Sequence, residues 1–586
     1  MHAERRIVMP TYTESYSAKI NRKVQRKQHI VAVAAGRIPA DLILKNATYL
    51  NVFSNELCTG DIAIADGLFV GMGTYSGPNE IDMSGKVITP GLLDAHIHLE
   101  SSLVSPYEFA KAVLPHGTTT VITDPHEIAN VMGTDGIEYM LEATEGLPVD
   151  VHFMLPSCVP ASPVDEAGAS LDYRSIDSFY DHPRVLGLAE MMNYIGIING
   201  DTSCLEKIAG SQSHHKKIDG HAPGLTGCDL NAYIAAGVYS DHECADVEEA
   251  MEKLRKGQFI MIRDGTAAHN LDNLIPLLVP KYYSRCMFAT DDKHPNDLLE
   301  IGHMDFHIRR AIAQGVDPII AVKTASHNAA RYFLLNNKGA IAPGYLADFV
   351  VVDDLESFKI NSVYKRGVLR FADGEVLPFT EPNINTFLQE KAMNTFHIGG
   401  KLSAKDFVDK RPRGVIGMVP GEIITTDEGY ADCIDTEKDI LKICVVERHK
   451  NTRHIGMGYI KGYGLKKGAV ATSFSHDSHN IIAVGTNEED IALAVNRIVD
   501  IHGGITVVAD NEPVADVVLE IAGLMSDRKL TEVNDDLENA KEAAYKLGVS
   551  HGIDPFMTLS FMSLPVIPEL RLTTRGIIDV NTQQYL

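Results

Sequence analysis

Between residues 86 and 292 the chain alternates between short apolar runs and longer segments with helical periodicity. Apolar residues recur three and four positions apart in SPYEFAKAVLPHG (105–117) and GTDGIEYMLEATEG (133–146), as expected of amphipathic helices. The eight apolar runs are VITPGLLDAHIH (87–98), TTTVITD (118–124), DVHFMLPS (150–157), RVLGLAE (184–190), KIDGH (217–221), GVYSDH (237–242), QFIMIR (258–263) and RCMFATDD (285–292). Eight strands, each followed by a helical crossover, predict an α/β fold with a (β/α)8 TIM-like barrel.

The flanks of this region have other patterns. Residues 46–73 and 338–354 contain short strands and turns, which separates them from the barrel at 86–335. After residue 400, strands such as IIAVGTN (481–487) and long helices predict a separate α/β or α+β domain over 401–586. Residues 1–30 form a polar N-terminal extension, and His327 in the last barrel helix is expected to be a packing residue.

Five of the eight apolar runs end in residues that commonly bind metals. In a barrel of this kind the carboxyl ends of the strands form the active-site face. Residues two apart on a strand point to the same side, so His96 and His98 are both expected to face inward. The predicted metal ligands are His96, His98, Glu190, His221, His242 and Asp291.

Six ligands exceed the need of one tetrahedral ion, so the pattern favours two divalent ions about 3.5–4 Å apart. Imidazole and carboxylate donors without thiolate suit zinc, iron or manganese. Glu190 is well suited to bridge the two ions, because each of its oxygens can bind one of them.

The composition limits which binding partners and which cellular compartment are consistent with the sequence. The chain has 53 Lys plus Arg and 78 Asp plus Glu, a formal net charge of −25, and such a surface repels nucleic acid. None of its eight cysteines forms a CxxC pair, which is typical of a reducing compartment. No stretch of 18 apolar residues and no signal-peptide core occurs. We therefore expect a cytoplasmic protein without a membrane partner.

Several motifs resemble the amidohydrolase superfamily. They are HIHLESS (96–102), GLAEMMN (187–193), IDGHAPG (218–224), SDHE (240–243) and ATDD (289–292). Many superfamily members have a carboxylated lysine where this chain has Glu190. That difference, with TDPHEIANVMG (123–133), NYIGIINGD (193–201) and RHIGMGYIKGYGLKKGAVATSFSHDSHN (453–480), resembles the adenine deaminase family. The resemblance covers nearly all of the chain from about residue 30.

The resemblance implies an amidohydrolase-type barrel with a small β-sandwich domain built from 31–85 and 336–400. It also implies a binuclear manganese or iron site that hydrolyses adenine to hypoxanthine and ammonia, a purine salvage reaction. A homo-oligomer is expected, with a dimer favoured. The alternative is a cyclic-amide or amide hydrolase on the same scaffold, against which Glu190 in place of lysine argues mildly.

The residues support a mechanism for this reaction. Water held by two divalent ions has its pKa lowered toward about 7, so hydroxide can attack C6 of the purine. Asp291 can orient that hydroxide, accept its proton and pass it to the leaving amine. Protonation of N1 requires a second acid, and Glu100, His126 and Glu127 remain alternatives.

The segment SHDSHN (475–480) contains His476, Asp477 and His479 within six residues. It could be a loop whose polar groups bond locally, a cover for the barrel mouth, or another metal site. Hydroxide attack benefits from a mouth closed to water. Our hypothesis is that these three residues lie near the active site, from their own chain or from a neighbour.

Overall fold

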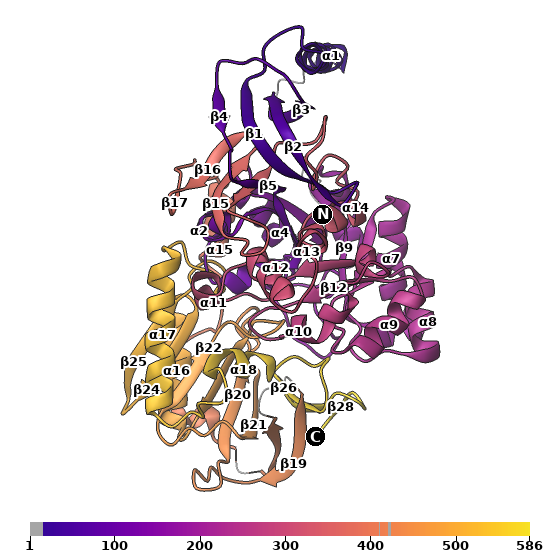
Figure 1. Ribbon diagram of the computed structural model, residues 1–586. Helices are drawn as coiled ribbons and strands as arrows, with labels where there is room; N and C mark the ends of the chain where they lie inside the picture. The colour runs from indigo at the N-terminus through magenta and orange to yellow at the C-terminus, as the bar shows by residue number, and fades with distance from the viewer. Residues whose placement is uncertain (1–15, 410, 420–423) are drawn as a thin grey trace.

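The computed structural model describes residues 16–409, 411–419 and 424–586. The first half of the predicted N-terminal extension, residues 1–15, lies outside the described residues. In Figure 1 the barrel occupies the middle of the molecule, a small β-rich domain lies at one end and the C-terminal domain at the other. The two ends of the barrel strands therefore face different domains.

Eight parallel strands form the barrel. They are β6 (Leu92–Ile97), β7 (Thr118–Thr123), β8 (Asp150–Leu155), β9 (Val185–Met191), β10 (Lys217–Gly220), β11 (Ser240–Asp241), β12 (Phe259–Arg263) and β13 (Cys286–Ala289). Hydrogen bonds join β6 to β10 in one run and β11 to β13 in another. A parallel bridge between Ile97 and Asp291 connects β6 to the end of β13, and the Gly220 amide donates to Ser240 Oγ at 3.3 Å. The predicted barrel is confirmed.

One predicted run needs a correction. In the run 87–98, Val87–Pro90 is a separate strand, β5, which pairs with strands of the small domain. The barrel strand starts only at Leu92, after Gly91. A Cβ atom on Gly91 would lie 2.3 Å from Thr119 Oγ1, so only glycine lets the chain pass from one sheet to the other here.

Helices surround the barrel between its strands. They are α2 (Pro106–Val113), α3 (His126–Met132), α4 (Thr134–Ala143), α5 (Tyr173–Asp177), α6 (Tyr194–Ile198), α7 (Thr202–Ser213), α8 (Gly227–Ala236), α9 (Val247–Arg255), α10 (Leu271–Leu274), α11 (Pro295–Glu300), α12 (Met304–Ala313), α13 (Pro318–Thr324) and α14 (His327–Tyr332). Aspartates cap several of them: Asp201 accepts from Cys204 N at 3.0 Å and Asp246 from Glu249 N at 3.0 Å. Side chains such as Leu93, Met154 and Met287 fill the barrel interior.

The small domain combines both flanks of the barrel. It contains helix α1 (Tyr16–Ala34) and strands β1 (Leu42–Asn51), β2 (Glu56–Ala65), β3 (Leu68–Met72), β4 (Glu80–Asp82), β5, β14 (Phe349–Val352), β15 (Ile360–Lys365), β16 (Val368–Ala372) and β17 (Glu375–Val376). Hydrogen bonds link all nine strands into one sheet. The antiparallel pair of β5 and β14 joins the segment before the barrel to the segment after it.

The C-terminal domain has an eight-stranded, mainly antiparallel sheet in the order β19-β18-β21-β20-β23-β22-β24-β25. Its elements are β18 (Arg413–Met418), β19 (Thr425–Ala431), β20 (Leu441–Val446), β21 (Ile455–Lys461), β22 (Ala469–Thr472), β23 (Ile481–Gly485), α16 (Glu488–Asp500), β24 (Gly504–Ala509), β25 (Glu512–Val518), α17 (Leu530–Lys546), α18 (Pro555–Phe561), β26 (Leu570–Thr573), β27 (Gly576–Asp579) and β28 (Gln584–Tyr585). Helix α15 (Thr386–Ala392) precedes it.

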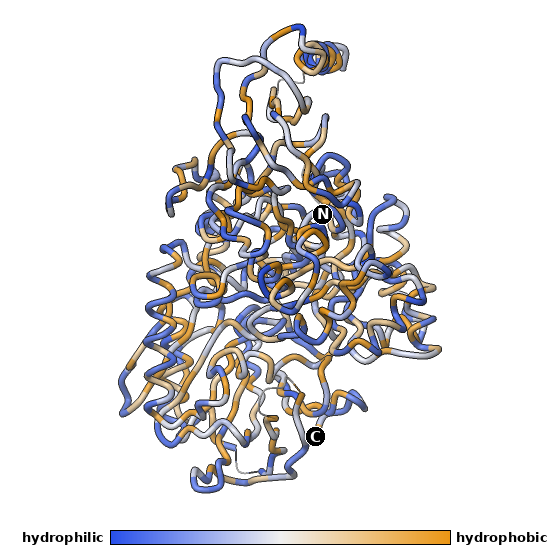
Figure 2. The backbone as a smooth tube through the Cα atoms, viewed as in Figure 1, coloured by the Kyte–Doolittle hydropathy of each residue, from blue (hydrophilic) through white to orange (hydrophobic). Residues whose placement is uncertain are grey.

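The two faces of this sheet pack differently. On β20, Cys444 and Val446 face the cluster around α16, whereas Ile443 and Val445 belong to the large core shared with the barrel. Figure 2 shows hydrophobic residues concentrated in the barrel and this sheet, with hydrophilic outer turns. A bridge between Val104 and Ser526 also joins the domains. The C-terminal domain is therefore packed firmly on the carboxyl end of the barrel.

No helix among the described residues combines the length and the apolar composition that spanning a membrane requires.

A buried charge network holds the small domain to the amino end of the barrel. Lys365 Nζ lies 2.8 Å from Asp150 and 2.8 Å from Asp348, and Lys338 contacts both carboxylates as well. Burial alone would raise the pKa of Asp150, but Lys365 and Lys338 outweigh it and hold the pKa well below its ordinary value.

Replacing Lys365 by Met should destabilise the fold by about 3–5 kcal/mol, because it removes one partner from a buried charge network. Denaturation followed by circular dichroism measures the loss. Lys359→Met is the control, since Lys359 is exposed and lies 3.7 Å from Asp353; little change is expected there. Equal stability of the two variants would contradict this account.

Candidate metal centre

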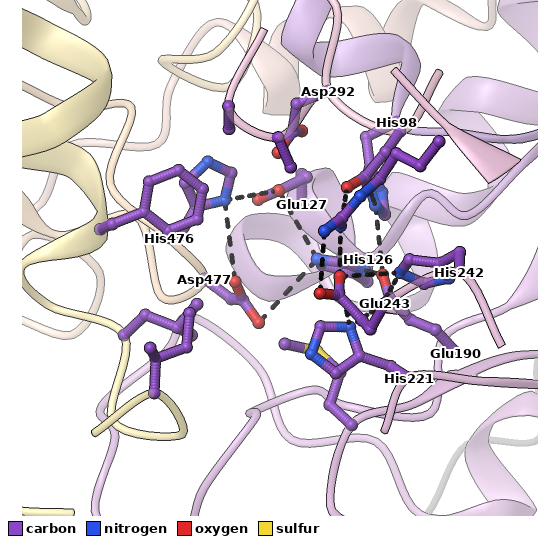
Figure 3. A pocket seen from close by; sticks show the side chains of 18 residues that line it. His98, His126, Glu127, Glu190, His221, His242, Glu243, Asp292, His476 and Asp477 are labelled. Atoms are coloured by element: carbon purple, nitrogen blue, oxygen red, sulfur yellow. Dashed lines mark hydrogen bonds and ion pairs between the residues drawn. The ribbon is translucent and has the colours of Figure 1, made fainter. Parts of the chain in front are cut away.

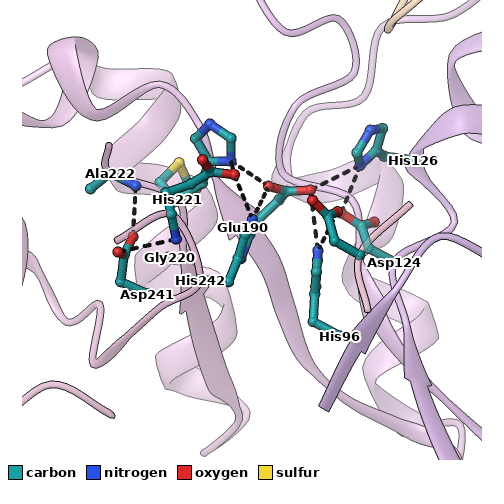
Figure 4. A network of polar contacts seen from close by, with 12 residues as sticks. His96, Asp124, His126, Glu190, Gly220, His221, Ala222, Asp241 and His242 are labelled. Carbon is teal, nitrogen blue, oxygen red and sulfur yellow. Dashed lines mark hydrogen bonds and ion pairs between the residues drawn. The ribbon is translucent and has the colours of Figure 1, made fainter. Parts of the chain in front are cut away.

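The six predicted ligands converge at the carboxyl end of the barrel. Glu190 lies at their centre: Oε1 is 3.1 Å from His98 Nε2, while Oε2 is 2.7 Å from His221 Nδ1 and 3.2 Å from His242 Nε2. Asp291 Oδ1 is 3.1 Å from His98 Nε2 and 3.5 Å from His96 Nε2. Figure 4 shows Glu190 between the two groups of histidines. Its two oxygens face different imidazoles, which suits a bridging carboxylate.

The donor set fits divalent metal ions. His96, Glu190 and His242 are at most 2 % exposed. Within the described residues, His242 Nδ1 is buried without a hydrogen-bond partner, and His96 Nε2 and His242 Nε2 face the carboxylates of the same cluster. Ligand atoms of His96, His242 and Asp291 lie within 4.8 Å of one another, as do those of Glu190, His221 and His242. Buried nitrogens without partners are rare in proteins unless they serve a ligand.

Neighbouring residues position the ligands. The His221 amide donates to Tyr233 Oη at 3.0 Å, and the Ala222 amide donates to Asp241 Oδ1 at 2.8 Å (Figure 4). Asp241 is buried and accepts from Lys253 Nζ at 2.9 Å. The turn that carries His221 is thus fixed on both sides, as metal ligands require.

Asp291 sits in a strained conformation. Its φ of 64° is in the left-handed region, which costs a non-glycine residue about 1–3 kcal/mol. Its amide donates to His96 O at 2.9 Å, and its Oδ2 accepts from Arg263 Nη1 at 2.7 Å. Burial alone raises the pKa of Asp291, but Arg263 and the nearby imidazoles outweigh it and hold the pKa well below its ordinary value.

Sequence reasoning missed Arg263 and Glu243. Arg263 Nη2 donates to Glu243 Oε2 at 2.9 Å, and Glu243 Oε1 is 3.4 Å from His221 Nδ1. Arg263 ends an apolar run, so its place at the site could have been inferred. A guanidinium is not a metal ligand, however, and a search for ligand types passes over it.

The segment after β7 forms another wall of the site. His126 Nδ1 lies 2.8 Å from Asp124 Oδ2, and His126 Nε2 lies 3.5 Å from Glu127 Oε1. Asp124, which was not predicted, also places its carbonyl oxygen 3.1 Å from His98 Nδ1. His126, Glu127 and Asp292 all line the pocket (Figure 3).

Glu100 takes a different place from the other two acid candidates. Its Oε1 accepts from the Ile128 amide at 3.2 Å, and the residue is absent from the pocket lining. Burial raises the pKa of Glu100 to about 7. The structure therefore puts Glu100 behind the α3 segment, where it can affect Glu127 but does not face the pocket.

The SHDSHN loop connects β22 to β23 and enters the same pocket. His476 Nδ1 lies 2.9 Å from Glu127 Oε1, His479 Nε2 pairs with Glu127 Oε2, and Asp477 Oδ2 lies 3.9 Å from His126 Nε2. His476 and Asp477 line the pocket, as Figure 3 shows, and the His476 ring stacks on Phe561 at 4.5 Å. His479 is fully buried behind them. The loop thus comes from the same chain.

Comparison with known proteins places the chain in a family. A family model described as the adenine deaminase C-terminal domain matches residues 422–584, and an amidohydrolase family model matches residues 87–370. Adenine deaminase from Desulfatibacillum aliphaticivorans is 47% identical over 95% of this chain and 98% of its own length. The chain belongs to the adenine deaminase family. Adenine deaminase from Bacillus velezensis is 43% identical over 94% of this chain and 97% of its own length.

The two family models correspond to the two sides of the site. The amidohydrolase match contains every predicted ligand from His96 to Asp291, and the adenine deaminase C-terminal match contains the SHDSHN loop. Among solved structures, beta-aspartyl dipeptidase from Fervidobacterium islandicum AW-1 aligns at 18% identity, with a TM-score of 0.44, over 58% of this chain and 99% of that one.

We expect about two divalent ions per chain in this adenine deaminase family member. His242→Ala should lower the metal content, because buried His242 Nε2 faces Glu190 at 3.2 Å in the predicted ligand cluster. Elemental analysis of purified protein measures the ratio. His214→Ala is the control, since His214 lies outside the predicted ligand cluster, where it contacts Asp177 at 2.9 Å and stacks on the Tyr180 ring at 4.8 Å. Unchanged metal content in His242→Ala would remove this residue from the ligand set.

Proposed function

We infer that this chain hydrolyses adenine to hypoxanthine and ammonia. The observation that carries the inference is 42–47% identity, over nearly the whole chain, to proteins named adenine deaminase. The Glu190-centred donor cluster and the loop that covers it are consistent with that reaction. The amide hydrolase alternative is not favoured, because these relatives match both the barrel and the C-terminal domain.

We propose manganese or iron as the ions, with zinc as the alternative, because the six ligands offer imidazole and carboxylate without thiolate. The proposed ligands remain His96, His98, Glu190, His221, His242 and Asp291. When bound, two divalent ions would supply a water acidic enough to attack at neutral pH. The side chains of the protein must then transfer protons and bind the purine.

Asp291 is the proposed proton acceptor. Its Oδ1 faces the histidines of β6, whereas its Oδ2 is held by Arg263 at 2.7 Å. Arg263 keeps the carboxylate ionised and fixes its orientation. Asp291 can therefore orient the attacking water, accept its proton and pass that proton to the leaving amine.

The proposed acid for N1 lies among His126, Glu127 and His476. Burial alone would lower the pKa of His476, but Glu127 outweighs it and raises the pKa to about 9. His476 is then protonated at neutral pH, and its Nε2 is buried without a hydrogen-bond partner in the described chain. His476 can donate to a purine ring nitrogen, and Glu127 can carry the proton between His126 and His476.

Asp477 is the proposed contact for the exocyclic amine. Its Oδ2 is buried without a hydrogen-bond partner among the described residues, and burial raises its pKa to about 6. A carboxylate accepts hydrogen bonds from an amino group, and a neighbouring imidazolium donates to a ring nitrogen. Together, His476 and Asp477 could bind the two nitrogens of the adenine amidine, the ring nitrogen and the exocyclic amine.

The compartment and assembly are also proposed. All eight cysteines are free, which suits a reducing compartment, and we place the protein in the cytoplasm. The site is complete within one chain, because the loop and the barrel come from the same copy. The expected dimer therefore need not share an active site.

Asp291→Asn should lower turnover of adenine by about 10²–10⁴, because the amide keeps the shape but cannot accept a proton. Ammonia release from the metal-loaded protein measures the effect. Asp510→Asn is a matched control at an exposed position in the C-terminal domain. Turnover of Asp291→Asn within tenfold of the natural protein would reassign the proton acceptor.

His476→Ala should raise KM for adenine by about ten- to hundredfold, because a hydrogen bond from a charged donor contributes about 1.5–3 kcal/mol. His479→Ala should mainly lower kcat, since His479 contacts Glu127 from outside the pocket. Metal content should stay unchanged in both. His551→Ala, at an exposed histidine that stacks on Tyr545, is the control. Unchanged kinetics in both loop variants would exclude a catalytic role for the loop.

A further inference from the structure

A second cavity, of about 320 Å³, lies at the opposite end of the barrel from the metal centre. Its walls come from the amino ends of β10, β12 and β13 and from α13 and α14; the lining residues are Lys217, Phe259, Tyr283, Ser284, Lys323, His327, Asn328, Arg331 and Tyr332. Lys217 and His221 are four residues apart on and just after β10, or about 13 Å. The cavity is large enough for a small metabolite.

The lining of this cavity carries positive charge only. Lys217, Lys323 and Arg331 contribute three cations, and no carboxylate is part of the lining. In the ranges that the structure describes, none of the three forms an ion pair with an acidic side chain. Three lysine and arginine side chains without a carboxylate ion-pair partner are unusual in a chain with a formal net charge of −25. Unpaired cations that converge on a cavity mark an anion site.

The individual contacts support this assignment. Lys323 is 8 % exposed, and its Nζ contacts only neutral oxygens, Asn55 Oδ1 at 2.5 Å and Tyr283 Oη at 3.2 Å. Arg331 Nη2 donates to the carbonyl oxygens of Leu335 and Lys338, whereas its Nε is buried without a hydrogen-bond partner in the described chain. Lys217 Nζ lies 4.9 Å from the centre of the Tyr332 ring. All three cations are held in place without an ion pair to a carboxylate among the described residues, although the charge of Asp219 on β10 acts on Lys217.

The pKa of His327 also reflects the positive charge around this cavity. Burial and then the charges of Arg331 and Lys323 lower the pKa of His327 to about 4. His327 is therefore neutral at physiological pH and can donate or accept a hydrogen bond. The packing role predicted for His327 is only part of its environment, because it also lines this cavity.

We propose that this cavity binds the phosphate group of a small phosphorylated metabolite, with Lys217, Lys323 and Arg331 as its anion ligands. Arginine and lysine together suit a phosphate, because the guanidinium offers directed donors and the ammonium groups offer compact charge. The Ser284 hydroxyl and the aromatic rings of Phe259, Tyr283 and Tyr332 remain for the organic part of the ligand. The site is independent of the deamination chemistry.

Calorimetric titration of the metal-loaded full chain tests this proposal with three probes: inorganic phosphate, ribose 5-phosphate and adenosine 5′-monophosphate. We expect one binding event per chain with a Kd below about 1 mM for an organic phosphate. Lys217→Glu and Lys323→Gln should each weaken it at least about tenfold, which corresponds to about 1.4 kcal/mol. Lys546→Gln, at an exposed lysine of α17, should bind as the natural protein does.

Phosphate can also bind divalent metal ions, so the variants must separate the two sites. Binding that Lys217→Glu and Lys323→Gln leave unchanged would place the ligand elsewhere and overturn the proposal, as would no binding of any probe. If neither organic phosphate bound more tightly than inorganic phosphate, the proposal that the ligand is a phosphorylated metabolite would be overturned. Lys217→Glu should still turn over adenine, which shows that it folds and keeps the proposal testable if Lys323→Gln does not fold.

Discussion

The buried carboxylate of Glu190 is the constraint on which the rest of the site depends. It is 2 % exposed, and an isolated carboxylate so far from water costs several kcal/mol. Five imidazoles lie within 4 Å of it, those of His96, His98, His126, His221 and His242. Without a metal, burial alone would lower the pKa of His242, but the Glu190 charge outweighs it and raises the pKa to about 10, so protonated imidazoles offset the carboxylate. Divalent ions would offset the same charge, and the strand ends hold imidazole and carboxylate donors that suit them. This explains why apolar strands end in histidines and carboxylates at a single rim.

Much of the fold could be predicted because barrel geometry is repetitive. Eight apolar runs with helical segments between them allow few other topologies, and their carboxyl ends must meet. The alternation of side chains along a strand brought His96 and His98 to one side, and their rings pack edge to face at 4.8 Å. The start of the run at 87–98 was wrong because β5 and β6 are both apolar, and only Gly91 separates the two strands, which belong to different sheets.

The contacts that complete the site could not be predicted from the hydrophobic periodicity of the sequence. His479 and Glu127 are 352 residues apart, and nothing local in either segment specifies their pairing. The composition of SHDSHN pointed to a functional loop, but which barrel residue it meets depends on how the C-terminal sheet docks. The pairing of Arg263 with Glu243 and Asp291 likewise joins three strand ends through side chains alone.

Charge balance connects these residues. Six carboxylates line the pocket, Glu127, Glu190, Glu243, Asp291, Asp292 and Asp477, against a single guanidinium, that of Arg263. Two divalent ions and a protonated His476 would offset the remaining five negative charges. The C-terminal domain therefore does more than cover the mouth, since its loop brings one carboxylate and one imidazolium that leave this balance unchanged. An adenine molecule, which is neutral, could then enter without disturbing it.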